Sequence, residues 1–265
     1  MLGANGAGKT TAVKVLLGLT APSGGHASLL GLPIGDPQAR RRVGYLPELF
    51  RYQGWLNGRE VLRLHAELAG LARQRWNEEI EDVLATADIR ERADDRVATY
   101  SKGMQQRLGL AVALLGRPEL VVLDEPSTAL DPLGRHELRA TIRGLRDRGT
   151  TVILNSHQLS EVEQVCDRVA IVHRGQLLAV GSLGELLSPG GVRLRATGLD
   201  GVMTDGLRRF GELEQDGAWL VIRGAREEDL PPIVDLVVQA GARVYGVELL
   251  SPSLEDRFRQ LLGSA

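Results

Sequence analysis

The first eleven residues carry the pattern of a phosphate-binding loop. Residues 3–10 match G-x-x-x-x-G-K-[ST], in which glycines let backbone N–H groups converge on phosphate at a helix N-terminus. Lys9 is spaced to reach the β- and γ-phosphates, and the Thr10 hydroxyl to ligate Mg²⁺. The predicted nucleotide-binding residues are Gly3, Asn5, Gly6, Ala7, Gly8, Lys9, Thr10 and Thr11.

Two neighbouring carboxylates follow an apolar run. Residues 120–123 are Leu-Val-Val-Leu, and Asp124 and Glu125 come directly after them. Such a run is typical of a central parallel strand, whose carboxyl end carries the active groups. One carboxylate could then serve a metal ion while the other accepts a proton. Two acids alone are equally well explained as a plain strand end, and the phosphate loop upstream favours the catalytic interpretation.

The rest of the chain supplies the elements that must position these groups. Apolar periodicity predicts a helix after the phosphate loop, with Val13 and Leu17 among the residues that face a sheet. Strands are expected at residues 43–48, 120–125, 151–154, 169–172 and 176–180, and helices at 38–42, 57–71, 77–87, 108–115 and 137–148. Asn57 and Glu60 have the spacing of a capping box. The alternation predicts an α/β fold.

A second, smaller domain is predicted at the C-terminal end. Residues 181–191 are rich in Gly, Ser and Pro, and the pattern changes after them. Strands are expected at 192–196, 219–222 and 244–250, and helices at 230–240 and 254–262. The predicted division is therefore 1–187 and 188–265, the latter being a small α+β domain.

Composition narrows the class of protein. A net charge of −2 and a pI near 6.2 argue against a nucleic-acid partner, which usually requires a basic surface. Cys166 is the single cysteine, which excludes an internal disulfide and fits a reducing compartment. The longest apolar run, residues 108–116, is shorter than the roughly 20 residues that span a bilayer. Any membrane role is expected to act through a partner.

Later segments add to the phosphate loop a pattern that resembles the ATP-binding subunits of ABC transporters. The resemblance covers residues 1 to about 187. Residues 100–107, Tyr-Ser-Lys-Gly-Met-Gln-Gln-Arg, resemble the signature segment, with Lys102 in place of a glycine. Residues 127–131 resemble the D-loop. His157, after Asn155 and Ser156, matches the switch histidine.

This resemblance implies a role for each matching residue. Asp124 would hold Mg²⁺, Glu125 would polarise the attacking water, and His157 would contact the γ-phosphate. Ser101 and Gly103 would meet the γ-phosphate of ATP bound to an opposite subunit, and Asp131 would lie at the dimer interface. Glu48 stands where the family usually has a glutamine, and it could still ligate Mg²⁺.

One expected feature has no counterpart in this sequence. The family has a strand and an adenine-stacking aromatic residue ahead of the phosphate loop, and only Met1 and Leu2 precede it here. The resemblance therefore implies a natural start upstream of Met1, or another segment in place of the strand.

The resemblance also implies a fold and a function. The expected fold is a P-loop NTPase with a RecA-like mixed sheet, a helical subdomain at about 49–116 and the small C-terminal domain. Residues 251–258 and the strings around Tyr45 and Ser101 look like the ABC-2 type exporter branch. The expected protein is an ATPase that uses ATP and Mg²⁺ and pairs with a second ATP-binding subunit. It would power export through a separate permease at the cytoplasmic face of the membrane, with no nucleic acid.

Two alternatives stay open at this point. One is a soluble ABC protein that acts in translation or DNA repair, although such proteins usually carry two cassettes or a long coiled-coil insertion. The other is a truncated remnant that turns over no ATP.

Overall fold

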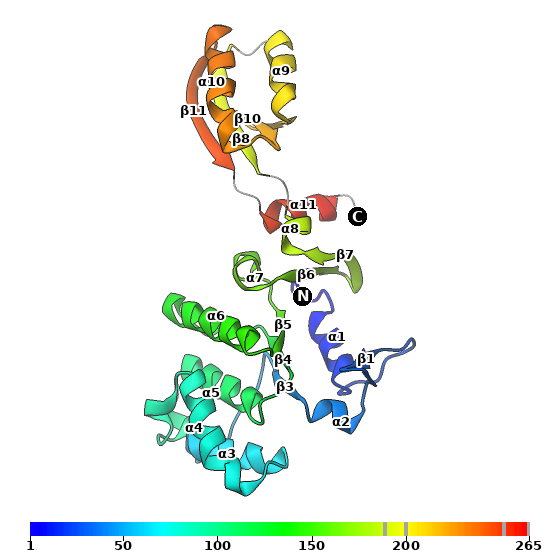
Figure 1. Ribbon diagram of the computed structural model, residues 1–265, viewed down its shortest axis with the longest axis vertical. Coiled ribbons are helices and arrows are strands. Elements are labelled where there is room, and N and C mark those ends of the chain that lie inside the picture. The colour runs from blue at the N-terminus through cyan, green and yellow to red at the C-terminus, as the bar shows by residue number, and fades with distance from the viewer. Residues whose placement is uncertain (188–189, 199–200, 251–252, 264–265) are drawn as a thin grey trace. The chain divides into compact units, whose positions relative to one another are not determined.

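The chain divides into two compact units in the computed structural model (Figure 1). The structure describes residues 1–187, 190–198, 201–250 and 253–263. One unit is Met1–Gly181 and the other is Ser182–Ala265. The sequence predicts a boundary after residue 187, whereas the two units separate near the end of strand β7 (Gln176–Ser182). Residues 188 and 189, part of the predicted boundary, lie outside the described residues.

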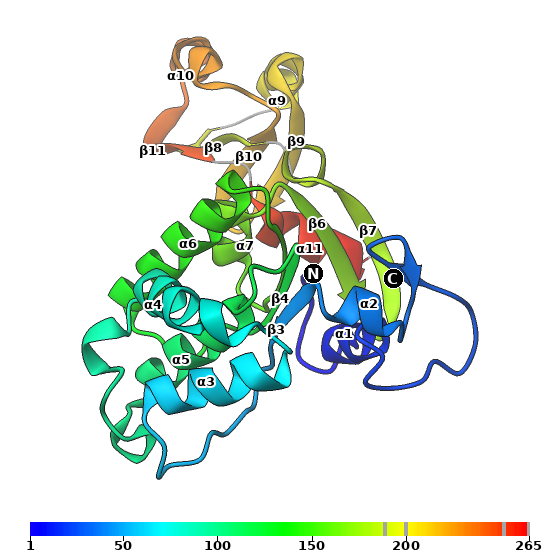
Figure 2. The ribbon, with the colours of Figure 1, turned by 60° about the horizontal axis from the view of Figure 1, so that its bottom comes forward.

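A parallel sheet forms the centre of the first unit. Strand β4 (Leu120–Asp124) pairs in parallel with β3 (Val43–Leu46) on one side and β5 (Thr151–Asn155) on the other. Strands β6 (Arg168–His173) and β7 form a two-stranded sheet, side by side in Figure 2. These strands confirm the α/β prediction.

Leu2 stands between the two sheets. It forms parallel bridges to Ser156 after β5 and to Ile171 in β6. The Leu2 amide donates to Ala170 O at 2.8 Å, and its carbonyl accepts from Val172 N at 2.8 Å. Leu2 therefore lies in the sheet position directly ahead of the phosphate loop, where the family resemblance implies a strand.

Both faces of the parallel sheet are covered, and all five residues of β4 are buried. Leu120 and Val122 pack with Val13 of helix α1 (Lys9–Leu16). Val121 and Leu123 belong to the larger core built with the helices of the opposite face. Val13 and Leu17, which the sequence predicts to face a sheet, are both buried, whereas the neighbouring Ala12 is exposed. This packing places the phosphate loop and the end of β4 at the same edge of the sheet.

Helices fill the segment between β3 and β4, as predicted. The capping box of Asn57 and Glu60 starts helix α3 (Gly58–Leu68), followed by α4 (Trp76–Thr86) and α5 (Lys102–Leu114). Helix α5 begins earlier than the apolar run predicts, because the Ser101 hydroxyl accepts from Met104 N and caps it. The smaller elements of this unit are β1 (Ser28–Leu29), β2 (Leu32–Pro33), α2 (Pro37–Arg40), η1 (Arg73–Arg75), η2 (Arg90–Arg92) and η3 (Val97–Thr99).

Two helices lie next to the ends of β4 and β5. Helix α6 (Pro132–Asp147) starts earlier than predicted, because Asp131 caps it and Pro132 takes its first position. Helix α7 (Leu159–Val165) follows β5 directly and was not predicted. No helix in the described ranges is long and apolar enough to cross a membrane.

The second unit is an antiparallel sheet with helices packed on it. The strand order is β11-β8-β10-β9, and Val192, Leu194 and Ile222 pack with Ile233 and Val237. Strand β9 (Glu212–Asp216) and helix α9 (Gly201–Leu207) were not predicted from the sequence, and β9 shows no apolar alternation because its residues are mostly polar. The elements are α8 (Leu183–Leu186), β8 (Gly191–Thr197), α9 (Gly201–Leu207), η4 (Arg208–Phe210), β9 (Glu212–Asp216), β10 (Trp219–Arg223), η5 (Glu227–Asp229), α10 (Leu230–Gln239), β11 (Arg243–Leu250) and α11 (Leu254–Gly263).

Candidate active site

The phosphate loop curls around a cavity at the N-terminus of α1. The cavity has a volume of about 330 Å³, within the range of small-molecule sites. Gly8, the N-cap of α1, has φ +100°, which a side chain would strain. A Cβ on Gly3 would lie 2.3 Å from Val172 O, so this glycine allows the loop to approach β6. The lining residues are Asn5, Gly6, Ala7, Gly8, Lys9, Thr10, Thr11, Glu48 and Glu125.

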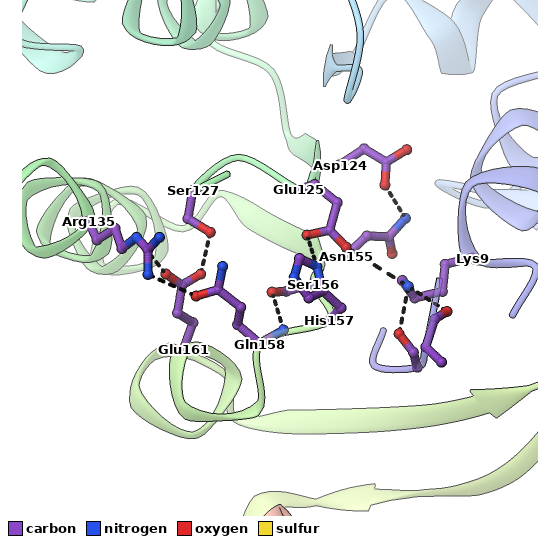
Figure 3. A network of polar contacts seen from close by, with 12 residues as sticks. Lys9, Asp124, Glu125, Ser127, Arg135, Asn155, Ser156, His157, Gln158 and Glu161 are labelled. Carbon is purple, nitrogen blue, oxygen red and sulfur yellow. Dashed lines mark hydrogen bonds and ion pairs between the residues drawn. The ribbon is translucent and has the colours of Figure 1, made fainter. Parts of the chain in front are cut away.

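Lys9 is the buried cation of this cavity. Its Nζ donates to Gly3 O at 2.7 Å and to Ala4 O at 3.2 Å, and it lies 3.9 Å from Glu125 Oε1 (Figure 3). The ammonium group thus stands between the loop carbonyls and a carboxylate. A phosphate group in the cavity would compete for it with a full negative charge.

Glu125 and His157 form the contact that the sequence alone could not show. Glu125 Oε2 lies 2.8 Å from His157 Nδ1, and Glu125 is only 7% exposed. The Glu125 backbone has φ +51°, a left-handed conformation that costs about 1–3 kcal/mol in a non-glycine residue. The contact orients the imidazole and leaves its Nε2 for a second partner.

Burial raises the pKa of Glu125 above its ordinary value. The hydrogen bond and the charge of His157, followed by Lys9, act in the opposite direction. Nearby Glu48, although exposed, raises it further as a like charge. A carboxylate of raised pKa is a better proton acceptor at neutral pH than an ordinary one.

Asp124 is fully buried beside Glu125. Its Oδ1 accepts from Asn155 Nδ2 at 3.1 Å, while its Oδ2 is buried without a hydrogen-bond partner in the described chain. The pKa of Tyr45 rises to about 12 through burial, then through the charges of Asp124 and Glu48. An unpaired carboxylate oxygen at this edge fits a hard cation or one of its waters.

The described residues contain no cluster of three or more His, Cys, Asp or Glu side chains that could hold a metal. Of the residues predicted to bind Mg²⁺, Thr10 and Glu48 line the phosphate-loop cavity, and Asp124 ends β4 next to Glu125.

Three predicted residues lie away from this cavity. Ser101 and Gly103 start α5, and Asp131 caps α6 by accepting from Gly134 N at 2.8 Å. None of the three lines the phosphate-loop cavity. Ser101 and Asp131 are exposed. Within one chain the structure thus brings together the phosphate loop, Glu48, Glu125 and His157, and leaves the signature segment facing elsewhere.

Sequence reasoning missed the residues that support this site. Asn155, next to Asp124 across the β4–β5 pair, holds the Asp124 carboxylate. Glu161 in α7 and Arg135 in α6 contact the segment after Glu125. In the sequence, Glu161 is an acid with apolar neighbours on a short segment. A solvent-exposed helix has the same pattern, so the pattern does not identify a buried acid.

Comparison with known proteins decides the family. A model described as ABC transporter matches residues 1–128. An uncharacterized ABC transporter ATP-binding protein of Synechocystis is 42% identical over 275 residues, covering 98% of this chain and 74% of that protein. The chain belongs to the ATP-binding proteins of the ABC transporter family.

Two further relatives of this ABC ATP-binding protein extend the comparison. A Nod factor export ATP-binding protein of Burkholderia thailandensis is 41% identical over 189 residues, covering 71% of this chain and 62% of that one. A solved ATP-binding subunit of an ABC transporter has a TM-score of 0.64 and 33% identity, covering 70% of this chain and 78% of that chain. The predicted P-loop NTPase fold is confirmed, and the ABC protein binds and hydrolyses ATP.

Proposed function

We propose that this ABC ATPase powers export by forming a two-subunit assembly on a transmembrane partner. The carrying observation is the separation within one chain: Lys9 and Glu125 meet at the phosphate-loop cavity, whereas Ser101 lies outside it at the exposed start of α5. A helix N-terminus carrying a hydroxyl is suited to phosphate. By the family resemblance, that segment would contact ATP held by a second copy of the chain.

The phosphate-loop side supplies the groups for hydrolysis. Glu125 accepts the proton of the attacking water, and its raised pKa and burial suit that role. His157 is held by Glu125 through Nδ1 and offers its other nitrogen to the γ-phosphate. Lys9 leaves the carbonyls of Gly3 and Ala4 to bind the β- and γ-phosphates.

The remaining predicted residues bind the nucleotide and its cation. Backbone N–H groups of residues 5–11 surround the phosphates at the start of α1. Thr10, Asp124 and Glu48 would hold Mg²⁺, which when bound neutralises charge on the transferring phosphoryl group. The Asn155 amide holds one oxygen of the Asp124 carboxylate, and the other oxygen would be left for the cation.

Mixing two inactive variants tests the paired arrangement. Lys9→Ala disables the phosphate loop, and Ser101→Arg disables the signature segment. In a mixed dimer one site combines the intact Lys9 of one chain with the intact Ser101 of the other. Random pairing makes about half of the dimers mixed, so about a quarter of wild-type ATP hydrolysis returns in a two-fold dimer. No recovery on mixing would contradict a site built from two chains.

The permease is proposed to dock near Glu48. Leu49 is 87% exposed and Trp55 is 73% exposed, in the segment just after the cavity-lining Glu48. Both belong to one short segment, and exposed apolar side chains that gather in one place are typical of a protein interface. The export relative supports the transport direction.

Trp55→Asp is expected to release the protein from membranes of its own cells, whereas the matched change Leu177→Asp, in β7 and 61% exposed, leaves it bound. Equal retention of both variants would contradict this docking site.

A further inference from the structure

Glu161 is a buried acid that the proposed hydrolysis does not use. It lies in α7, four residues after His157, and is 6% exposed. The Ser127 hydroxyl donates to its Oε2 at 2.5 Å. Its Oε1 has no hydrogen bond among the described residues, although Arg135 Nε lies 3.9 Å away. Burying a carboxylate is costly unless partners compensate for it, so its position calls for an explanation.

The contacts of Glu161 join two segments that each carry a reacting group. Ser127, itself fully buried, is two residues after Glu125. Glu161 follows His157 on the segment after β5. The Ser127–Glu161 hydrogen bond therefore ties the turn after β4 to the turn after β5, as Figure 3 shows.

Arg135 adds a second tie between the same segments. Its Nε donates to Leu130 O at 3.2 Å, and its Nη1 donates to Gln158 Oε1 at 3.1 Å. Leu130 belongs to the turn after Glu125, and Gln158 is the residue after His157. The positive charge of Arg135 also faces the otherwise unpaired Oε1 of Glu161.

The turn that Glu161 reaches holds a strained residue. Glu125 keeps its left-handed backbone while its amide donates to Asn155 O at 3.0 Å and its carbonyl accepts from Thr128 N at 3.3 Å. A strained residue persists only where its surroundings over-determine it. Besides the side-chain contacts of Asp124 and Glu125 themselves, the Ser127 hydrogen bond ties this turn to the His157 segment.

We propose that Glu161 is a positioning residue for hydrolysis. Through Ser127, and with Arg135 as its counter-charge, it fixes the turn of residues 125–131 against residues 155–161. It thereby keeps Glu125 Oε2 and His157 Nδ1 in contact. The proposal rests on the roles proposed above for Glu125 and His157.

Steady-state hydrolysis by the full chain tests the proposal. Glu161→Ala is expected to lower kcat at least about tenfold, since small misplacements of reacting groups are costly, while KM for ATP changes less than about twofold. Glu161→Gln keeps an acceptor for the Ser127 hydroxyl and is expected to recover most of the rate. Ser127→Ala lowers kcat as well, and the double variant Glu161→Ala/Ser127→Ala is no slower than Glu161→Ala alone.

Glu79 provides a matched control. It is a glutamate of α4 that is 1% exposed, with one oxygen lacking a hydrogen bond and an ion pair to Arg75, and it lies among the helices between β3 and β4. Glu79→Ala is expected to lower the melting temperature without lowering kcat per folded molecule. If Glu161→Ala and Glu79→Ala have equal kcat values, Glu161 has no positioning role. The same conclusion follows if Ser127→Ala retains the wild-type rate.

Failure of the proposed function gives a different result. If Glu125→Gln hydrolyses ATP at the wild-type rate, the role of Glu125 is wrong, whatever Glu161→Ala does. If Glu125→Gln is inactive and Glu161→Ala is fully active, only the positioning role is overturned. Should Glu161→Ala not fold, Ser127→Ala still decides, because it removes the same hydrogen bond and keeps the buried volume almost unchanged.

Discussion

The phosphate-loop side and the signature segment differ in how much of their chemistry one chain completes. At the phosphate loop, Lys9, Glu125 and His157 come from three distant parts of the sequence and are linked by contacts of 2.8–3.9 Å. At the signature segment, the Ser101 hydroxyl accepts a local hydrogen bond from Met104 N, and Ser101 is exposed.

This difference separates two requirements for catalysis. Buried groups that hold one another can shift a pKa and orient a nucleophile within a single chain. An exposed helix start can stabilise charge only when a partner brings the phosphate to it. Changes on the first side should therefore alter the nucleotide affinity already in the isolated chain. Changes on the second should act only in an assembled dimer.

The largest effect is expected from removing the proton acceptor of the phosphate-loop side. Glu125→Gln keeps the shape but removes the proton acceptor, so kcat is expected to fall by about 10²–10⁴-fold. ATP affinity is expected to stay nearly intact, because Glu125 has no proposed role in binding phosphate. Phosphate release and equilibrium nucleotide binding check the two quantities. A variant that hydrolyses ATP normally would remove Glu125 from the mechanism.

A smaller effect contrasts the two sides directly. Lys9→Ala is expected to weaken ATP binding to the isolated chain by roughly ten- to a hundredfold, the equivalent of one lost charge-assisted interaction. Ser101→Arg is expected to leave that affinity unchanged while abolishing hydrolysis. Nucleotide titration at protein concentrations too low for dimerisation measures the ATP affinity of both variants. If Ser101→Arg weakened binding by the monomer as much as Lys9→Ala, the two sides would not be separate.

The pH profile sharpens the description of the phosphate-loop side. Glu125 must be ionised to accept a proton, so kcat should fall as the pH drops through its raised pKa. His157→Ala removes interactions that lower the pKa of Glu125, so the midpoint of this acidic fall should move to higher pH. Log kcat against pH for both proteins checks this. A shift toward lower pH would contradict the stated contact.

The smallest effects concern stability and have opposite signs on the two sides. Because the folded state raises the pKa of Glu125, its stabilising contribution is present at low pH and is lost as the pH rises through that pKa. Glu125→Gln should therefore melt above the wild type at neutral pH. Ser101→Ala removes the cap of α5 and should cost about 1 kcal/mol, or roughly 2–4 °C. Thermal unfolding without nucleotide checks both, with Ser101→Asn as the variant that keeps a cap.

The sequence predicted the features that depend on local pattern. The parallel strands, the capping box at Asn57 and the apolar helices follow from periodicity and turn residues, and their positions are correct within a few residues. Helix starts were less accurate. The apolar residues of α5 and α6 begin well after the caps Ser101 and Asp131, so hydrophobic spacing places these starts too late.

Side-chain geometry at the site could not be predicted in the same way. The distance between Glu125 and His157, and the tie from Ser127 to Glu161, arise because β4 and β5 are neighbours and end at the same edge. The order of residues along the chain does not specify that these two strands are neighbours. Strand β9 was missed for a related reason: its polar residues show no apolar alternation, and it is defined by its pairing with β10.

The hydrogen bonds between Leu2 and β6 connect local opening of the backbone to the position of the Lys9 charge. Leu2 is joined to β6 by two hydrogen bonds, and the next residue, Gly3, supplies the carbonyl that accepts from Lys9 Nζ. When these hydrogen bonds open, the Gly3 carbonyl moves with Leu2, so Lys9 loses one of its two carbonyl acceptors in the same event. Deuterium exchange at the Val172 amide, whose acceptor is Leu2 O, therefore measures how often this contact of the lysine is open to change.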